Sequence, residues 1–169
     1  MLEELFEKYL LKKSKEHDHP DGTYVSAHLG TNDKEDLFKW VKENKIPNPT
    51  EPMDYHATIS YSRKGVPDVV HHDFKLPMVA KIVGWHVFPT QTGGKCLVAA
   101  LESKDLTNAH NSVIDEHGAT HSFPEYHPHI TVSYDYNSDV APKTFPNMQV
   151  KFTKVKIEPL DPEFKPKKA

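Results

Sequence analysis

The sequence contains little cysteine and arginine, and it has no long hydrophobic run. Its single cysteine, Cys96, excludes an internal disulfide and a zinc site built from several cysteines. No apolar stretch approaches the length that a bilayer-spanning helix requires, and the first residues do not follow a signal-peptide pattern. We therefore expect a cytoplasmic protein that does not bind a membrane.

The charge balance argues against a surface for long nucleic acids. The formal net charge is −3, and Arg63 is the only arginine among the 21 basic residues. Proteins that bind long nucleic acids usually carry a basic face rich in lysine and arginine. A small anionic ligand fits this composition better. The length of 169 residues suits a single domain over residues 1–169, and we expect a monomer.

Hydrophobic periodicity predicts an α+β fold in which strands and helices alternate. Helical spacing occurs at 2–14, 31–46 and 103–118, and the last helix has Ser103 as its N-cap and Gly118 at its end. Strands are expected at 24–29, 56–62, 80–90, 95–103, 129–135 and 148–161. Because strand, helix and strand follow one another in each half, we predict two similar lobes around a shared cleft.

The strands at 56–62 and 129–135 carry nearly the same motif, HATISYS and HITVSYD. Side chains alternate along a strand, so the His, Thr and Ser of each copy are expected on one face. A third His-x-Ser triplet begins at His110, but it falls in a predicted helix, where positions i and i+2 do not share a face. The repeat therefore predicts two imidazoles and two threonine hydroxyls that converge on one cleft.

Such a pair is suited to breaking a phosphodiester. A neutral imidazole can take a proton from the attacking hydroxyl, and a protonated one can give a proton to the leaving oxygen. Threonine hydroxyls can donate hydrogen bonds to the phosphate oxygens. We expect no metal and no other cofactor, because the remaining histidines lack a matching spacing of carboxylates or cysteines. His28, which shares a face with Tyr24 and Ser26, is assigned a structural role.

The paired motifs and the order of elements resemble the 2H phosphoesterase superfamily. The segments GTYVSAHL, EYHPHITVSYD and VKIEPLD are more closely similar to the phage anti-CBASS nucleases, which degrade the cyclic di- and trinucleotides that activate bacterial CBASS defence. The resemblance implies pseudo-symmetric antiparallel sheets in two lobes, with flanking helices around a central cleft. It also implies a substrate such as 3′,3′-cyclic GMP-AMP or cyclic tri-adenylate, cleaved inside the infected cell.

The resemblance also implies roles for individual residues. His56 and His129 are the expected acid and base, in an order that the sequence leaves open, and the expected phosphate-binding pair is Thr58 with Thr131. The expected substrate-binding residues are Tyr24, Glu158 and Trp85. For Trp85, which is a candidate for stacking on a base, packing in the core is the alternative.

Two other functions stay open at this point. One is a 2H phosphodiesterase that acts on RNA ends or on 2′,5′-oligoadenylate. The other is a protein that sequesters cyclic nucleotides without cleaving them, although binding alone does not require two imidazoles.

Overall fold

The computed structural model describes residues 22–66, 68–90, 93–120 and 125–159, and the helix predicted at 2–14 lies outside these residues. The described elements are β1 (Thr23–Leu29), α2 (Thr31–Glu43), η1 (Pro52–Asp54), β2 (His56–Ser62), η2 (His71–Asp73), β3 (Met78–Pro89), β4 (Lys95–Glu102), α3 (Lys104–His117), β5 (His129–Ser133) and β6 (Gln149–Pro159). The predicted strands and the two predicted helices that fall on described residues are therefore confirmed.

The six strands form one sheet in the order β2-β1-β6-β3-β4-β5, with every neighbouring pair antiparallel. We call β2, β1 and β6 lobe 1, and β3, β4 and β5 lobe 2. The pairing of β6 with β3 joins the lobes, so they are two halves of a continuous sheet. The α+β class is confirmed, and each motif strand is the outermost strand of its lobe.

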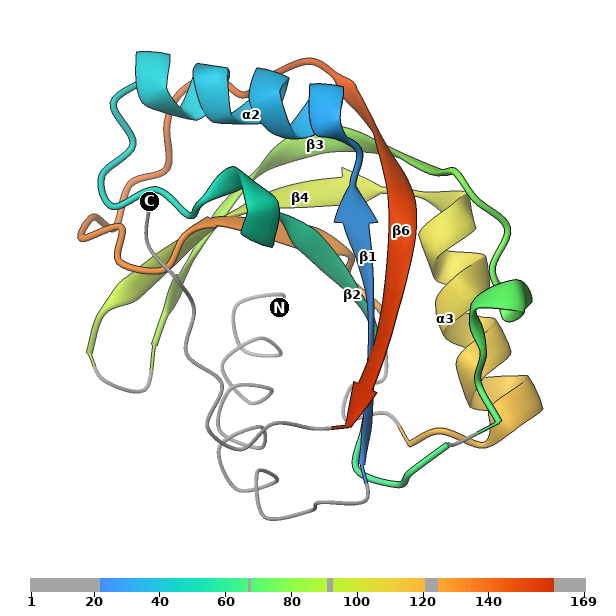
Figure 1. The fold of residues 1–169 in the computed structure, drawn as a ribbon. Helices are drawn as coiled ribbons and strands as arrows, with labels where there is room; N and C mark the ends of the chain where they lie inside the picture. The colour runs from blue at the N-terminus through green and yellow to red at the C-terminus, as the bar shows by residue number, and fades with distance from the viewer. Residues whose placement is uncertain (1–21, 67, 91–92, 121–124, 160–169) are drawn as a thin grey trace.

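The sheet is strongly curled, so that its two edges approach each other (Figure 1). The backbone N–H of Thr50, just before β2, donates to the carbonyl of Val132 in β5 at 2.8 Å. Next to this contact, Pro49 forms an isolated antiparallel bridge with Ser133. We call the line along which the segments around β2 and β5 meet the seam.

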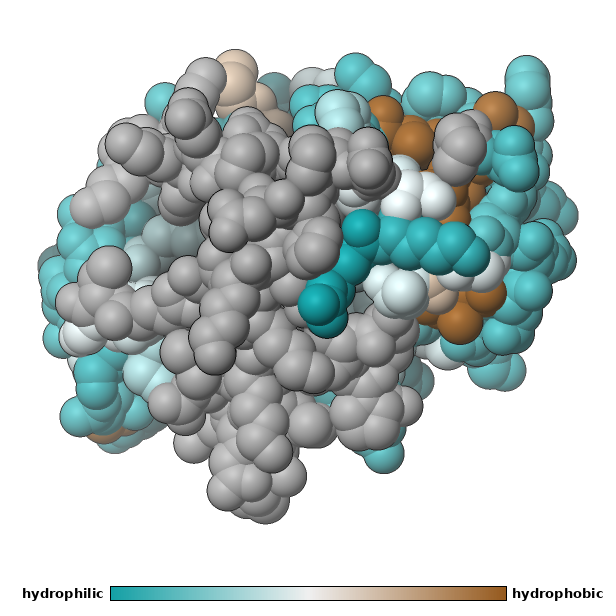
Figure 2. Space-filling view, turned by 90° about the horizontal axis from the view of Figure 1, so that it is seen from below, coloured by the Kyte–Doolittle hydropathy of each residue, from teal (hydrophilic) through white to brown (hydrophobic). Residues whose placement is uncertain are grey.

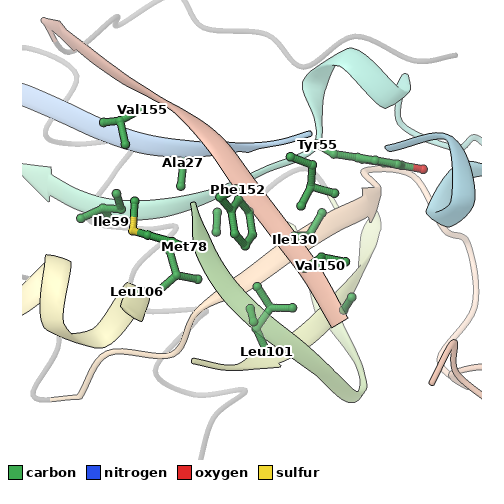
Figure 3. Close-up of a cluster of buried hydrophobic side chains, with 14 of the residues drawn as sticks. Ala27, Tyr55, Ile59, Met78, Leu101, Leu106, Ile130, Val150, Phe152 and Val155 are labelled. Carbon is green, nitrogen blue, oxygen red and sulfur yellow. The ribbon is translucent and has the colours of Figure 1, made fainter. Parts of the chain in front are cut away.

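The curl encloses the hydrophobic core. Figure 3 shows buried side chains from all six strands gathered in one cluster, among them Ala27, Ile59, Met78, Leu101, Ile130 and Phe152. Helix α2 adds Leu37 and Val41 to this core, and α3 adds Leu106 and Val113. Burial of these apolar surfaces is the main force that holds the curled sheet and its helices together.

Polar residues cover most of the described surface in the face shown in Figure 2, where hydrophobic side chains form small groups. Most of the large exposed hydrophobic residues among the described ones, such as Met53 and Val140, come from loops and short turns, whereas Val83 lies in β3. In the parts of the chain that the structure describes, no helix is long and apolar enough to cross a membrane.

Helix α3 is capped as its sequence predicts. The Ser103 hydroxyl accepts a hydrogen bond from the Leu106 N–H at 3.0 Å and donates one to the Val79 carbonyl in β3 at 2.6 Å. At the other end, Gly118 adopts the left-handed conformation, with φ of 72°, which a glycine reaches without strain. One serine side chain thus starts the helix and fixes it to the sheet.

This double role predicts that Ser103→Ala lowers the free energy of unfolding by about 1–3 kcal/mol, because a cap and a buried hydrogen bond are both lost. Urea denaturation followed by circular dichroism measures the change. Ser112→Ala is the matched control, since the Ser112 hydroxyl bonds to the exposed Glu116 within the same helix. Equal losses in the two variants would contradict the assignment.

Candidate functional site

The first motif strand contains a β-bulge directly after its threonine. Along the β1–β2 pairing, Ser26 lies opposite Thr58 and Val25 lies opposite Ser60, so that Ile59 has no partner in the register. The extra residue interrupts the alternation of side chains. Ser60 is therefore buried, opposite the core residue Val25, instead of sharing the face of the motif histidine.

The second motif strand has the same irregularity at the same place. Along the β4–β5 pairing, Val98 lies opposite Thr131 and Leu97 lies opposite Ser133, so that Val132 is skipped. Ser133 is fully buried. The expectation that each motif serine lies beside its histidine therefore does not hold in either lobe, and the reason is the inserted residue. The bulges bring the following tyrosines, Tyr61 and Tyr134, back to the motif face.

Each motif histidine is held by the carbonyl two residues before it. His56 Nδ1 donates to the Asp54 carbonyl at 2.7 Å, and His129 Nδ1 donates to the His127 carbonyl at 2.9 Å. Because a carbonyl can only accept, both rings carry a proton on Nδ1. Nε2 is then the nitrogen of each ring that gains or loses a proton.

Each motif threonine is hydrogen-bonded to a half-buried tyrosine. The Tyr24 hydroxyl lies 2.8 Å from Thr58 Oγ1, and Tyr134 bonds to the side chain of Thr131. Burial raises the pKa of Tyr134 to about 12 and raises that of Tyr24 even further. Both phenols therefore stay protonated at neutral pH, and each fixes the orientation of its threonine hydroxyl.

Lobe 1 contains a third imidazole that stacks on the first motif histidine. The His28 and His56 rings lie 5.4 Å apart at 25°, and His28 Nε2 is hydrogen-bonded to the Ser26 hydroxyl at 2.9 Å. Burial, together with His56 and nearby lysines, lowers the pKa of His28 to about 3. His28 is thus a neutral ring that supports His56. In the sequence, Ser26 and His28 stand two residues apart in a predicted strand, and this spacing indicates that the two side chains share a face.

A second stacked pair holds the bulge of β2. The Tyr126 hydroxyl donates to the Thr58 carbonyl at 2.6 Å, and His110 Nδ1 donates to the Ile59 carbonyl at 2.7 Å. The two rings lie 4.2 Å apart and are nearly parallel, at 5°. His110, whose triplet is not part of the repeat, therefore helps to shape the first motif. Nothing in the sequence indicates this contact, because it joins three distant segments.

The bulge of β5 is held from the other side of the seam. The Val132 carbonyl accepts from the Thr50 N–H at 2.8 Å, and the single hydroxyl proton of Ser133 is shared between the carbonyls of Pro47 and Asn48, at 2.7 and 3.0 Å. Residues 47–50 lead into β2, and Tyr126 lies just before β5. Each bulged motif strand is thus braced by the segment that delivers the other motif.

These contacts also bring the two motifs together. Thr50 meets Val132 on one side, and Tyr126 meets Thr58 on the other. The bridge at the seam is antiparallel, so the stretch from 50 to 58 runs against the stretch from 132 back to 126. His56 lies in the first of these stretches and His129 in the second. The two motif histidines therefore lie along the same part of the seam.

The remaining predicted site residues fall into two groups. Glu158 of β6 lies opposite Tyr24 in the sheet, beside the first motif. Trp85 is not brought to the seam: it lies opposite the core residue Ala99, its ring is 5.4 Å from that of Trp40, and its indole N–H donates to the Thr144 carbonyl at 2.8 Å. Trp85 therefore packs against α2. Within the described ranges, no group of three or more His, Cys, Asp or Glu is placed to hold a metal ion.

The buried His28 predicts a pH dependence of stability. Its folded pKa of about 3 is below the ordinary value of 6.5, so between these values the unfolded chain binds a proton that the folded chain does not. The contribution is complete above pH 6.5 and is lost as the pH falls towards 3. In His28→Gln, the free energy of unfolding should rise less steeply with pH between about 4 and 6.5.

Urea denaturation at several pH values tests this expectation, with His72→Gln, a change at an exposed position of η2, as the control. In His28→Gln, the slope of the unfolding free energy against pH should fall by an amount that corresponds to at most one bound proton. In the control, the slope should stay as in the parent chain. An unchanged slope in His28→Gln would show that this ring is not held neutral.

Comparison with known proteins agrees with this geometry. The family model of the anti-CBASS protein Acb1 matches residues 21–167. The chain is 35% identical over 143 residues to the anti-CBASS protein Acb1 of Vibrio phage KVP40, covering 85% of this chain and 90% of that protein. It is 34% identical over 129 residues to that of Enterobacteria phage T4, covering 76% and 79%.

Solved structures show the same fold at low sequence identity. The crystal structure of E. coli LigT complexed with 3′-AMP superposes with a TM-score of 0.53 at 17% identity, covering 82% of this chain and 87% of LigT. LigT is a 2H phosphoesterase. On the family model, the phage relatives and this fold, the chain belongs to the anti-CBASS protein Acb1 family and has the 2H phosphoesterase fold.

Proposed function

We propose that the chain is a phosphodiesterase that hydrolyses cyclic di- and trinucleotides inside the infected bacterial cell, and so counters CBASS defence. The observation that carries this proposal is the matched pair of bulged strands, each of which offers one Nδ1-anchored histidine and one tyrosine-bound threonine at the seam. Two such groups supply an acid and a base without a metal ion. The family and the fold support the same assignment.

In the proposed reaction, one motif histidine starts neutral and the other starts protonated. The neutral Nε2 takes the proton of the attacking hydroxyl, from the ribose or from water, as that oxygen forms a bond to phosphorus. The protonated Nε2 gives its proton to the leaving 5′-oxygen as the phosphorus–oxygen bond breaks. The hydroxyls of Thr58 and Thr131 donate to the phosphate oxygens, on which charge builds up.

The surroundings of the seam fit a compact anionic substrate. Tyr24 and the adjacent Glu158 of β6 would contact the base or the ribose on the side of lobe 1. Lys154 and Lys156 lie opposite His28 and Ser26 in the same lobe, so positive charge is available for the phosphates there. Trp85 is left out of this proposal because it packs against α2.

The assignment predicts that His56→Ala and His129→Ala each lower turnover of 3′,3′-cyclic GMP-AMP and cyclic tri-adenylate by a factor of about 100 or more, because proton transfer needs both rings. Nucleotide binding should change only slightly. Chromatography of the products in the presence of EDTA measures turnover, and titration calorimetry measures binding. His72→Ala is the control, and Thr58→Ala and Thr131→Ala should have milder effects than the histidine variants.

The same assay separates the competing functions. Intact cyclic nucleotide recovered after denaturation of the parent protein would indicate a sequestering protein. Turnover of linear 2′,5′-oligoadenylate in preference to the cyclic substrates would indicate an enzyme that acts on RNA-like ends. Activity that disappears in EDTA, or that persists near the parent level in either histidine variant, would overturn the two-histidine mechanism.

Tyr126 is expected to be a positioning residue, since its hydroxyl holds the Thr58 carbonyl from the segment before His129. Tyr126→Phe keeps the ring on His110 and removes this one hydrogen bond. It should lower kcat about tenfold, with KM nearly unchanged, because the threonine of one motif is no longer fixed relative to the other.

Tyr136→Phe is the matched control for this prediction. The Tyr136 hydroxyl also donates to a backbone carbonyl, that of Val140, at 2.8 Å, but this bond lies within one loop. Both variants should lose a similar amount of stability in thermal unfolding, while only Tyr126→Phe loses kcat. A loss of kcat that follows the stability loss equally in both variants would show a purely structural role.

A further inference from the structure

Lobe 2 contains a cavity of about 540 Å³ next to the second motif histidine. Val98 and Ala100 of β4, Thr107 and Asn108 of α3, and Tyr126 line this cavity together with His129. Its volume lies in the range of pockets that hold small organic ligands. The roles proposed above, which are phosphate binding and proton transfer by the two histidines, do not use this space.

The two lobes differ at one pair of equivalent positions, and the smaller residue of that pair lines the cavity. In lobe 1 the residue opposite the motif histidine is His28, whose ring stacks on His56. In lobe 2 the residue opposite His129 is Ala100, which has only a methyl group. The space that an imidazole occupies beside the first motif is therefore left open beside the second.

The position next to it differs in the same direction. Ser26 lies opposite Thr58 in lobe 1, whereas Val98 lies opposite Thr131 in lobe 2. Val98 forms a small buried cluster with Phe88, and the ring of His86 stacks on Phe88 at 5.8 Å and 28°. All three of these residues line the cavity. Its wall on the sheet is thus apolar and aromatic around Val98 and Phe88, with Glu102 at the end of β4, while the corresponding face of lobe 1 is polar.

Helix α3 contributes Lys104, Thr107 and Asn108 to the cavity lining, and the segments beside it add the polar residues Glu102, Ser103 and His127. Thr107 and Asn108 come from the first turns of the helix, and the Asn108 amide can both donate and accept. A cavity with an aromatic and apolar wall and a polar rim suits a flat heterocycle, which stacks by its faces and forms hydrogen bonds at its edge. A phosphate would gain little from the apolar wall, and the motif residues already provide for it.

We propose that this cavity is the subsite for a nucleobase of the substrate, the base of the nucleotide on the His129 side of the cleaved phosphate. The inference rests on the proposed function, because it places the phosphate between the two motifs. It adds an orientation: the base lies in lobe 2, and the charged side of lobe 1 holds the rest of the ring. Preference among bases then depends on Asn108 and its neighbours in α3.

Binding by the parent protein tests the subsite without any need for turnover. Adenosine 3′-monophosphate is the probe, and ribose 5-phosphate is the probe without a base. Titration calorimetry should give at least about tenfold tighter binding of adenosine 3′-monophosphate, which corresponds to the stacking of one base. Equal affinity for the two probes would overturn the inference.

Two variants then locate the effect. Ala100→Leu fills the cavity and should reduce the preference for the nucleotide to less than about threefold, with ribose 5-phosphate bound as before. Asn108→Ala, at an exposed position of α3, should weaken binding of adenosine 3′-monophosphate about threefold. His72→Ala, at an exposed position of η2 that does not line the cavity, is the control and should behave like the parent chain. Thermal unfolding shows whether each variant is folded. If Ala100→Leu does not fold, Asn108→Ala still tests the subsite.

The outcome separates this inference from the proposed function. Base-dependent binding that is reduced in Ala100→Leu and in Asn108→Ala supports the subsite even if the parent chain shows no turnover, in which case the hydrolytic function fails alone. Turnover of cyclic nucleotides with base-dependent binding unchanged in both variants supports the function and overturns the subsite.

Discussion

The site depends on a reciprocal set of hydrogen bonds across the seam. A β-bulge frees backbone carbonyls from the ladder, and buried carbonyls must find other donors. In β2 these donors come from Tyr126 and His110, and in β5 the donor comes from Thr50. Because each bulge takes a donor from the segment that leads to the other motif, neither motif strand can reach its final shape alone. The curl of the sheet is therefore also what assembles the pair.

The sequence predicted the elements and the paired motifs well, for reasons that can be named. The strand-like pattern of each motif and a serine and a glycine at the ends of α3 are local signals, and the structure has strands at both motifs and a helix between these caps. The bulges are not local in this sense: HATISYS reads as a regular strand, and only the partners of Thr58 and Ser60 in β1 reveal the skipped residue. Ser60 and Ser133 were therefore placed on the wrong face by alternation alone.

The contacts that the sequence could not predict all join distant segments. His28 lies against His56 because β1 and β2 pair, and His110 reaches Ile59 because α3 packs against lobe 1. Trp85 shows the same limit from the other side, since its type suggests base stacking while its position opposite Ala99 directs it towards the core face. A residue type indicates what a side chain could do, but the register decides which face it occupies.

The pseudo-symmetry of the site has a chemical consequence. His56 and His129 are anchored in the same way through Nδ1, and their threonines are held in the same way by tyrosines, so the motifs alone do not distinguish the acid from the base. The distinction must come from what surrounds them. A neutral imidazole and lysines flank the first motif, and an apolar cavity flanks the second. These flanks break the symmetry that the motifs share, and they do so through the substrate: whichever way the nucleotide enters decides which ring faces the leaving oxygen.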